Sequence, residues 1–235
     1  MKISPVTENA FMVEFGQEIC SETTLIISEF IAFMKDRFQH DCIDIAPSYT
    51  KVMVQYRPHS NVYLTMIAGI ESWHLDRQSH KSKHSSMQRQ LHQLPVYYHQ
   101  DVAPDLAVVA KAKGLTQQQV IEHHCNKIYD VGAIGFTAGF AFLSSVDDEI
   151  AIPRHSTPRL QIPAGSVGIA DQQTAIYPDQ SPGGWHIIGN CPQSLFVEGR
   201  YPLSIFLLGI VCSLFRSPEK RFSSWEGSYG SVRDP

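Results

Sequence analysis

The segment between Gly132 and Gly189 most limits what this chain can fold into. It holds eight of the 15 glycines and five of the 14 prolines of the 235-residue chain, with short apolar runs between them. Glycine and proline at this density end helices and favour tight turns. The segment therefore predicts many short strands joined by turns, as in a compact barrel or sandwich, and excludes a long helix.

The first 75 residues carry a different pattern, in which helical and strand periods alternate. The predicted strands are Ala10–Phe15, Cys42–Ala46 and Lys51–Tyr56, and the predicted helices are one capped by Ser21 and one at Val62–Trp73. The first helix has apolar residues at i, i+3, i+4, i+7 and i+11 from Ile27 to Phe38, so a sheet must cover that stripe. The order β-α-β-β-α predicts an α+β fold of the ferredoxin-like sandwich type.

Residues 76–92 contain almost nothing to bury and predict a linker. This linker would separate an N-terminal domain, residues 1–75, from a second domain, residues 93–235. The elements predicted next are a strand at Leu94–Tyr98, a helix at Asp105–Lys113 that Gly114 ends, and a helix that a capping box of Thr116 and Gln119 starts.

Charge and composition exclude several classes of function. The net charge is −4 and the pI is near 6.2, so the chain lacks the basic face that nucleic acids require. We expect no secretory leader and no membrane span, because the longest apolar run, Tyr201–Phe215, is too short to cross a bilayer. The five cysteines are scattered without a CxxC pair, which predicts free thiols in a cytoplasmic protein.

Two arginines next to prolines are candidates for binding an anion. Arg154 follows Pro153 and Arg159 follows Pro158, so the backbone at both positions is restricted. A fixed guanidinium is suited to bind a carboxylate or phosphate with two parallel hydrogen bonds. The alternative is that both arginines pair with the acidic cluster at 147–149, and the sequence leaves both interpretations open.

Neutral polar residues after the arginines suggest a small-molecule cleft. Neutral hydrogen-bonding groups are supplied by Ser166, Gln173, Thr174 and Tyr177. The run from Gly135 to Phe142 lacks the Gly-Lys-Ser/Thr ending of a phosphate loop, so taken alone its aromatic residues predict a packed core. His124 lies on the apolar side of its helix, as a core histidine or a base would, and its neighbours His123 and Cys125 point elsewhere, which excludes a shared metal.

Taken together, these motifs resemble one family. They are Pro153-Arg154, Thr157-Pro158-Arg159, the run Pro163–Ala170, Gln173-Thr174, Tyr177-Pro178 and the run Ser181–Trp185, in one order and spacing. The chain is identified as similar to the allophanate hydrolase subunit 1 family, also called the 5-oxoprolinase B-subunit or KipI family, with its carboxyltransferase subdomains C and D. The chain departs from the family at Ala138, where proline is usual, and the match fades beyond Phe196.

The resemblance implies a cyclophilin-like β-barrel after the N-terminal α+β domain. It also implies a subunit that is inactive alone and works with two others, a homologous larger one (the C subunit, or allophanate hydrolase subunit 2) and the A subunit. That complex would bind ATP and hydrolyse 5-oxo-L-proline to L-glutamate, with any metal requirement unknown. The alternatives are an inhibitor of a sensor histidine kinase and a subunit of an allophanate or urea amidolyase-type amidohydrolase.

The resemblance also suggests roles for particular residues. The implied catalytic residues are His124, Arg154 and Arg159. The implied substrate-binding residues are Phe136, Phe140, Thr157, Ser166, Gln173, Thr174, Tyr177 and Trp185. In this hypothesis the arginines hold an anionic group of the substrate or intermediate, and the neutral polar groups position the amide.

Overall fold

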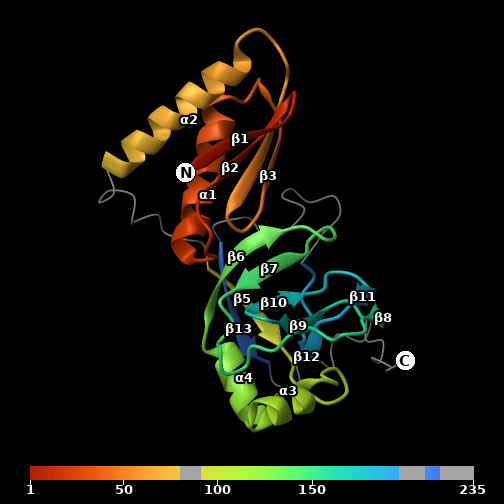
Figure 1. Cartoon of the computed structure of the whole chain (residues 1–235). Helices are drawn as coiled ribbons and strands as arrows, with labels where there is room; N and C mark the ends of the chain where they lie inside the picture. The colour runs from red at the N-terminus through yellow and green to blue at the C-terminus, as the bar shows by residue number, and fades with distance from the viewer. Residues whose placement is uncertain (80–90, 196–209, 218–235) are drawn as a thin grey trace. The chain divides into compact units, whose positions relative to one another are not determined.

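The structure is a computed structural model that describes residues 1–79, 91–195 and 210–217. The chain divides into two compact units, Met1–Gln90 and Leu91–Pro235. Each unit has its own sheet and its own hydrophobic core, so each is described by itself (Figure 1).

The N-terminal unit is a four-stranded antiparallel sheet with two helices. Its elements are β1 (Lys2–Thr7), β2 (Ala10–Glu14), α1 (Ser21–Arg37), β3 (Cys42–Pro47), β4 (Lys51–Tyr56) and α2 (Val62–Ser79). The strand order is β1-β2-β4-β3. This order matches a β-α-β-β-α-β ferredoxin-like sandwich in which β1 takes the place of the final strand. The strand is in the usual position in the sheet but stands at the beginning of the sequence instead of at the end. The predicted α+β class is therefore confirmed, with one strand more than the sequence suggested.

The unpredicted strand β1 contains Pro5 and only a few apolar residues. Proline is tolerated there because β1 is an edge strand, where one amide need not join the sheet. The core that the sheet and helices share contains Phe11, Phe30, Met34 and Met66, all without exposed surface. The apolar stripe of the first helix thus faces the sheet, as its spacing predicts.

Two helix boundaries differ from the predictions. Helix α1 begins at Ser21 with Cys20 as its N-cap residue, so Ser21 does not cap it. Helix α2 continues six residues past Trp73 to Ser79, because Arg77 in its last turns forms an ion pair with Glu29 of α1 at 2.7 Å. The start of the predicted linker was therefore wrong. Its other end was wrong as well, because a strand begins at Leu91; residues 80–90 lie outside the described part.

The second unit is built on a seven-stranded sheet of order β12-β9-β10-β7-β6-β13-β5 and a two-stranded sheet of β11 and β8. The strands are β5 (Leu91–Val96), β6 (Ile128–Ile134), β7 (Ala141–Ser144), β8 (Arg159–Ile162), β9 (Ser166–Ala170), β10 (Gln173–Ile176), β11 (Ser181–Gly183), β12 (His186–Asn190) and β13 (Val211–Arg216). The segment from 132 to 189 is thus made of short strands, as its glycine and proline content predicts.

The large sheet curls until its two edge strands meet. Just beyond β5, Tyr97 pairs with Asn190 at the end of β12, with amide-to-carbonyl distances of 2.8 and 3.0 Å in the two directions. This pairing joins the edges of the sheet and satisfies backbone groups that an open edge would leave unpaired. The interior is filled by apolar side chains such as Leu94, Val131 and Ile169, none of which is exposed.

Two short helices, α3 (Leu106–Lys113) and α4 (Gln117–Cys125), lie together at one end of this sheet (Figure 1). The capping box predicted for α4 is present, with the Thr116 hydroxyl accepting from the amide of Gln119. Gly114 ends α3 in a left-handed conformation, as predicted. Helix α3 begins one residue later than predicted, because Asp105 is its N-cap residue.

Other sequence predictions concern the remaining parts of the chain. All five cysteines are free thiols. Within the described residues, no helix is both long and apolar enough to cross a membrane. Of the apolar run Tyr201–Phe215, residues 210–215 lead into and form most of β13, and the earlier ones lie outside the described residues, as does the tail beyond Ser217.

Closure of the barrel requires a glycine at position 189. A Cβ atom there would lie 2.7 Å from a methyl carbon of Val96 and 3.1 Å from the carbonyl oxygen of Tyr97. We expect Gly189→Ala to lower the free energy of unfolding by about 1–3 kcal/mol, the usual effect of overpacking. Gly135→Ala is the matched control, because a Cβ at Gly135 meets nothing within 4 Å. Chemical denaturation followed by circular dichroism measures both, and equal stability of the two variants would contradict the prediction.

Candidate functional site

A pocket of about 510 Å³ opens on the barrel unit, between the connections that flank its strands. The β6–β7 connection contributes Phe136 and Phe140, and the segment before β8 contributes Arg154 and His155. Tyr177 follows β10, and Trp185 lies between β11 and β12. The full lining consists of Phe136, Phe140, Phe142, Arg154, His155, Ser156, Pro158, Tyr177, Pro182, Gly183, Gly184 and Trp185.

Aromatic rings form one wall of the pocket. The ring of Phe140, only 2% exposed, packs against Phe136, Phe142, Tyr177 and Trp185 with centroid distances of 4.8 to 6.1 Å. Phe136 is 64% exposed and has a φ of 71°, a left-handed conformation that is unusual for a side chain of this size. Such strain in a residue at a pocket is typical of functional sites.

Tyr177 supplies a neutral polar group inside this wall. Burial raises the pKa of its phenol to about 12, so the hydroxyl keeps its hydrogen at neutral pH. Gly183 makes room for it, because a Cβ at that position would overlap the Tyr177 oxygen. Gly183 of the Ser181–Trp185 motif thus leaves the space that Tyr177 occupies in the wall of the pocket.

The two predicted arginines have opposite environments. Arg154 is exposed, lines the pocket and makes no salt bridge with any of the described residues. Arg159 is 8% exposed and turns into the protein, where its two terminal nitrogens bind the two oxygens of Asp105 at 2.7 and 2.8 Å. The predicted alternative, pairing with the acidic cluster at 147–149, is wrong for Arg159, because its partner lies 54 residues away at the start of α3.

The Asp105 carboxylate is fixed from several sides. Besides Arg159, it accepts a hydrogen bond of 2.6 Å from the backbone amide of Ile187 in β12. Burial acts to raise the pKa of Asp105, but the hydrogen bonds from Arg159 and Ile187 and the charge of Arg159 outweigh it, so the pKa is lowered. Asp105 is therefore ionised at neutral pH.

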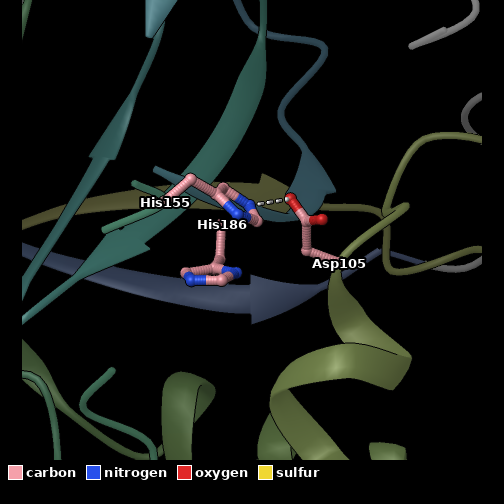
Figure 2. A group of neighbouring side chains, drawn as sticks. All are labelled: Asp105, His155 and His186. Atoms are coloured by element: carbon pink, nitrogen blue, oxygen red, sulfur yellow. Dashed lines mark ion pairs between the residues drawn. The ribbon is translucent and has the colours of Figure 1, made fainter. Parts of the chain in front are cut away.

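Two histidines lie against this ion pair. Figure 2 shows the imidazole of His155 turned toward the carboxylate of Asp105, at 3.5 Å between Nε2 and Oδ2, with the ring of His186 beside it. The two rings are 3.8 Å apart between centroids. The Nε2 atom of His186 donates to the carbonyl of Pro153, and burial lowers the pKa of this histidine.

The sequence did not single out Asp105, His155 or His186 as site residues. Asp105 is predicted only as the start of a helix, and His186 follows directly after the Ser181–Trp185 motif. No spacing rule joins residues separated by 50 and 31 positions, so only the fold brings them together. The one available signal was His155 itself, inside the proline-flanked arginine motif.

The potential ligand atoms of Asp105, His155 and His186 lie within 4.8 Å of one another, which is close enough to share a metal ion. However, both oxygens of Asp105 already bind the Arg159 guanidinium. A divalent cation among these residues would lie beside that positive charge without a second carboxylate to balance it. The geometry therefore favours a hydrogen-bonded cluster over a metal centre.

His124, the first predicted catalytic residue, lies in the barrel interior with no exposed surface. Its Nδ1 is 2.7 Å from the Tyr98 hydroxyl, and its Nε2 is 2.9 Å from the Thr174 hydroxyl. Burial lowers the pKa of His124 to about 3, so the ring is neutral. It does not line the pocket, and its surroundings are those of the core histidine that the sequence left as an alternative.

The remaining predicted residues divide between the pocket and the rest of the barrel. Phe136, Phe140, Arg154, Tyr177 and Trp185 line the pocket together. The others, which do not line it, are Ser166 and Thr174, both buried in strands, Gln173, partly exposed in β10, and Thr157, exposed before β8. The hydroxyl of Thr174 forms a hydrogen bond with His124 and also donates to the carbonyl of Gly168.

Fold and pocket define a two-unit α+β protein whose barrel unit carries an aromatic, arginine-containing pocket. The chain belongs to the family described as the carboxyltransferase domain, subdomain C and D, whose model matches residues 1–206. It is 34% identical over 232 residues to the 5-oxoprolinase B subunit of Bacillus subtilis, covering 96% of each chain.

Two solved structures of similar fold belong to longer chains. TTHA0988 superposes with a TM-score of 0.75 at 25% identity, over 89% of this chain and 40% of that one. The Kluyveromyces lactis urea carboxylase gives 0.68 at 14% identity, over 94% of this chain and 22% of that one, which shows the fold alone. This chain therefore corresponds to a part of those larger proteins.

The buried ion pair leads to a stability prediction. Arg159→Ala leaves the Asp105 charge buried and unpaired, so we expect the free energy of unfolding to fall by about 3–5 kcal/mol. The double variant Asp105→Asn, Arg159→Gln removes both charges and should recover most of that loss. The control is Arg154→Ala, an exposed change expected to cost under about 0.5 kcal/mol. Urea denaturation distinguishes these cases, and equal effects of the two single arginine variants would refute the ion-pair assignment.

The neutral, buried state of His124 leads to a prediction about pH. Its folded pKa, near 3, lies below the unfolded value, so its contribution is complete above about pH 6.5 and is lost as the pH falls toward 3. We expect wild-type stability to decrease between pH 7 and 5 by up to about 1.4 kcal/mol per pH unit more steeply than that of His124→Gln. Denaturation at a series of pH values tests this, and parallel curves would show that folding does not change the pKa of His124.

Proposed function

We propose that this chain is the B subunit of an ATP-dependent 5-oxoprolinase, which hydrolyses 5-oxo-L-proline to L-glutamate. The observation that carries the proposal is the 34% identity to the B. subtilis protein of that name over 96% of both chains. In this proposal the chain is inactive alone and works in the cytoplasm with the larger, homologous C subunit and with the A subunit.

The pocket has the chemistry that this substrate needs. 5-Oxoproline is a small flat lactam with one carboxylate, and a cavity of about 510 Å³ lies within the range of small-molecule sites. The aromatic wall around Phe140 suits the ring, and the Tyr177 hydroxyl can hydrogen-bond the amide. Arg154, with no acidic partner among the described residues, is available for the carboxylate.

We propose supporting roles for the two other catalytic candidates. Arg159 is held by Asp105 behind the pocket, so we propose that it supports the site and does not contact substrate. His124 is likewise proposed as a structural residue of the barrel. We assign ATP binding to the complex as a whole, because the chain lacks the Gly-Lys-Ser/Thr ending of a phosphate loop.

One observation favours a second function, the binding of a kinase. Phe136 exposes 64% of its surface at the rim of the pocket and is held in a strained conformation. An exposed aromatic side chain is a common anchor in protein interfaces. The same face could thus contact a helical bundle, as the inhibitor hypothesis requires, and a partner subunit would use it equally well.

Co-expression with candidate A and C subunits tests the proposed function. We would purify the complex and measure ATP hydrolysis that depends on 5-oxoproline, together with glutamate release. Activity that requires all three chains supports the proposal. A stable complex that hydrolyses another small amide instead would favour the amidolyase-type alternative. The absence of any complex, together with binding to a sensor kinase, would favour the inhibitor.

The role of Arg154 can be tested in the same complex. Arg154→Ala should raise the KM for 5-oxoproline by about tenfold to a hundredfold, because a charge-assisted hydrogen bond contributes about 1.5–3 kcal/mol. Arg57→Ala, an exposed arginine in the N-terminal unit, is the control. Calorimetric binding and steady-state kinetics measure the effect. An unchanged KM in Arg154→Ala would place the carboxylate elsewhere.

A further inference from the structure

Among the residues that the structure describes, His155 alone belongs both to the pocket and to the buried cluster. Its side chain is 27% exposed and lines the cavity next to Arg154. Its backbone amide donates to the carbonyl of Gly184 at 2.7 Å, which ties this segment to the opposite side of the pocket. A ligand in the cavity can therefore reach an imidazole whose backbone is fixed.

The Nε2 atom of His155 has two different neighbours at the same distance. It lies 3.5 Å from Oδ2 of Asp105, an acceptor, and 3.5 Å from a terminal nitrogen of Arg159, a donor. With hydrogen on Nε2, the ring faces the carboxylate and keeps a lone pair on Nδ1. Without that hydrogen, Nε2 can accept from Arg159. The Nε2 atom of His155 thus has a partner in place with or without its hydrogen.

The ring of His155 is also held against rotation. The imidazole of His186 packs on it at 3.8 Å, inclined by 39°. His186 is in turn fixed by its hydrogen bond of 3.0 Å to Pro153. The charged and titratable groups around His155 are therefore Asp105, Arg159, His186 and Arg154, the residue before His155 in the sequence. When His186 is neutral, these groups carry one negative charge and two positive charges.

We propose that His155 is the group of this pocket that exchanges protons with the substrate, and that Asp105, fixed by Arg159, is its positioning residue. This inference rests on the proposed function. Neutral His155 takes a proton from a water molecule as the water oxygen bonds to the lactam carbonyl carbon. It then gives that proton to the ring nitrogen as the carbon–nitrogen bond breaks and the nitrogen keeps the electron pair.

The test uses the assembled complex with His155→Ala and His155→Gln. We expect kcat to fall by about a hundredfold to ten-thousandfold, the usual contribution of general acid–base catalysis, while the Kd for 5-oxoproline changes by less than about threefold. Added imidazole should restore part of the activity of His155→Ala, and the acidic limb of the wild-type pH–rate profile should disappear in both variants. His40→Ala, an exposed histidine in the N-terminal unit, is the control.

The outcomes separate this inference from the proposed function. A wild-type complex that opens 5-oxoproline, with His155→Ala keeping more than half of its kcat, overturns the role of His155 alone. A wild-type complex without that activity overturns both. Metal analysis by mass spectrometry adds a third readout: one equivalent of a divalent metal in the wild type that is lost in His155→Ala would show a metal ligand instead. Imidazole rescue with unchanged metal content supports the proposal.

Discussion

The bond between Arg159 and Asp105 is the interaction on which the rest of the site depends. It joins β8 to the start of α3, and the amide of Ile187 adds β12 to the same carboxylate. A buried charge without its partner is strongly destabilising, so these segments, 54 and 82 residues apart along the chain, have to meet in one arrangement. The wall of the pocket that carries His155 is fixed as a consequence.

Two arginines five positions apart acquire different tasks from this arrangement. Arg154 stays at the cavity, where a cation without an acidic partner among the described residues can bind an anion. The charge of Arg159 is paired with that of Asp105, so Arg159 is not available to a ligand in the pocket. Sequence alone presents them as equals, because each follows a proline and each offers the same planar group. Only the fold decides which of the two faces solvent.

Local patterns predicted local structure well. The capping box at Thr116, the stop at Gly114 and the apolar stripe of α1 all follow from interactions within a few residues, so they were visible in the sequence. The aromatic and arginine side of the pocket was predicted through motif resemblance. The buried cluster and the continuation of α2 to Ser79 were missed, because they depend on Asp105 and Glu29, whose partners are distant in the chain.

The histidines of the barrel show what separates a structural imidazole from the one proposed to exchange protons. His124 and His155 both have two polar side-chain neighbours, so partner count does not distinguish them. The partners of His124 are hydroxyls at 2.7 and 2.9 Å that satisfy a neutral ring, and burial excludes any substrate. Those of His155 are a carboxylate and a guanidinium at 3.5 Å, which accommodate gain and loss of a proton at the edge of a cavity. Access to the cavity, together with one acidic and one basic neighbour, is the reason that we propose His155, and not His124, for proton exchange.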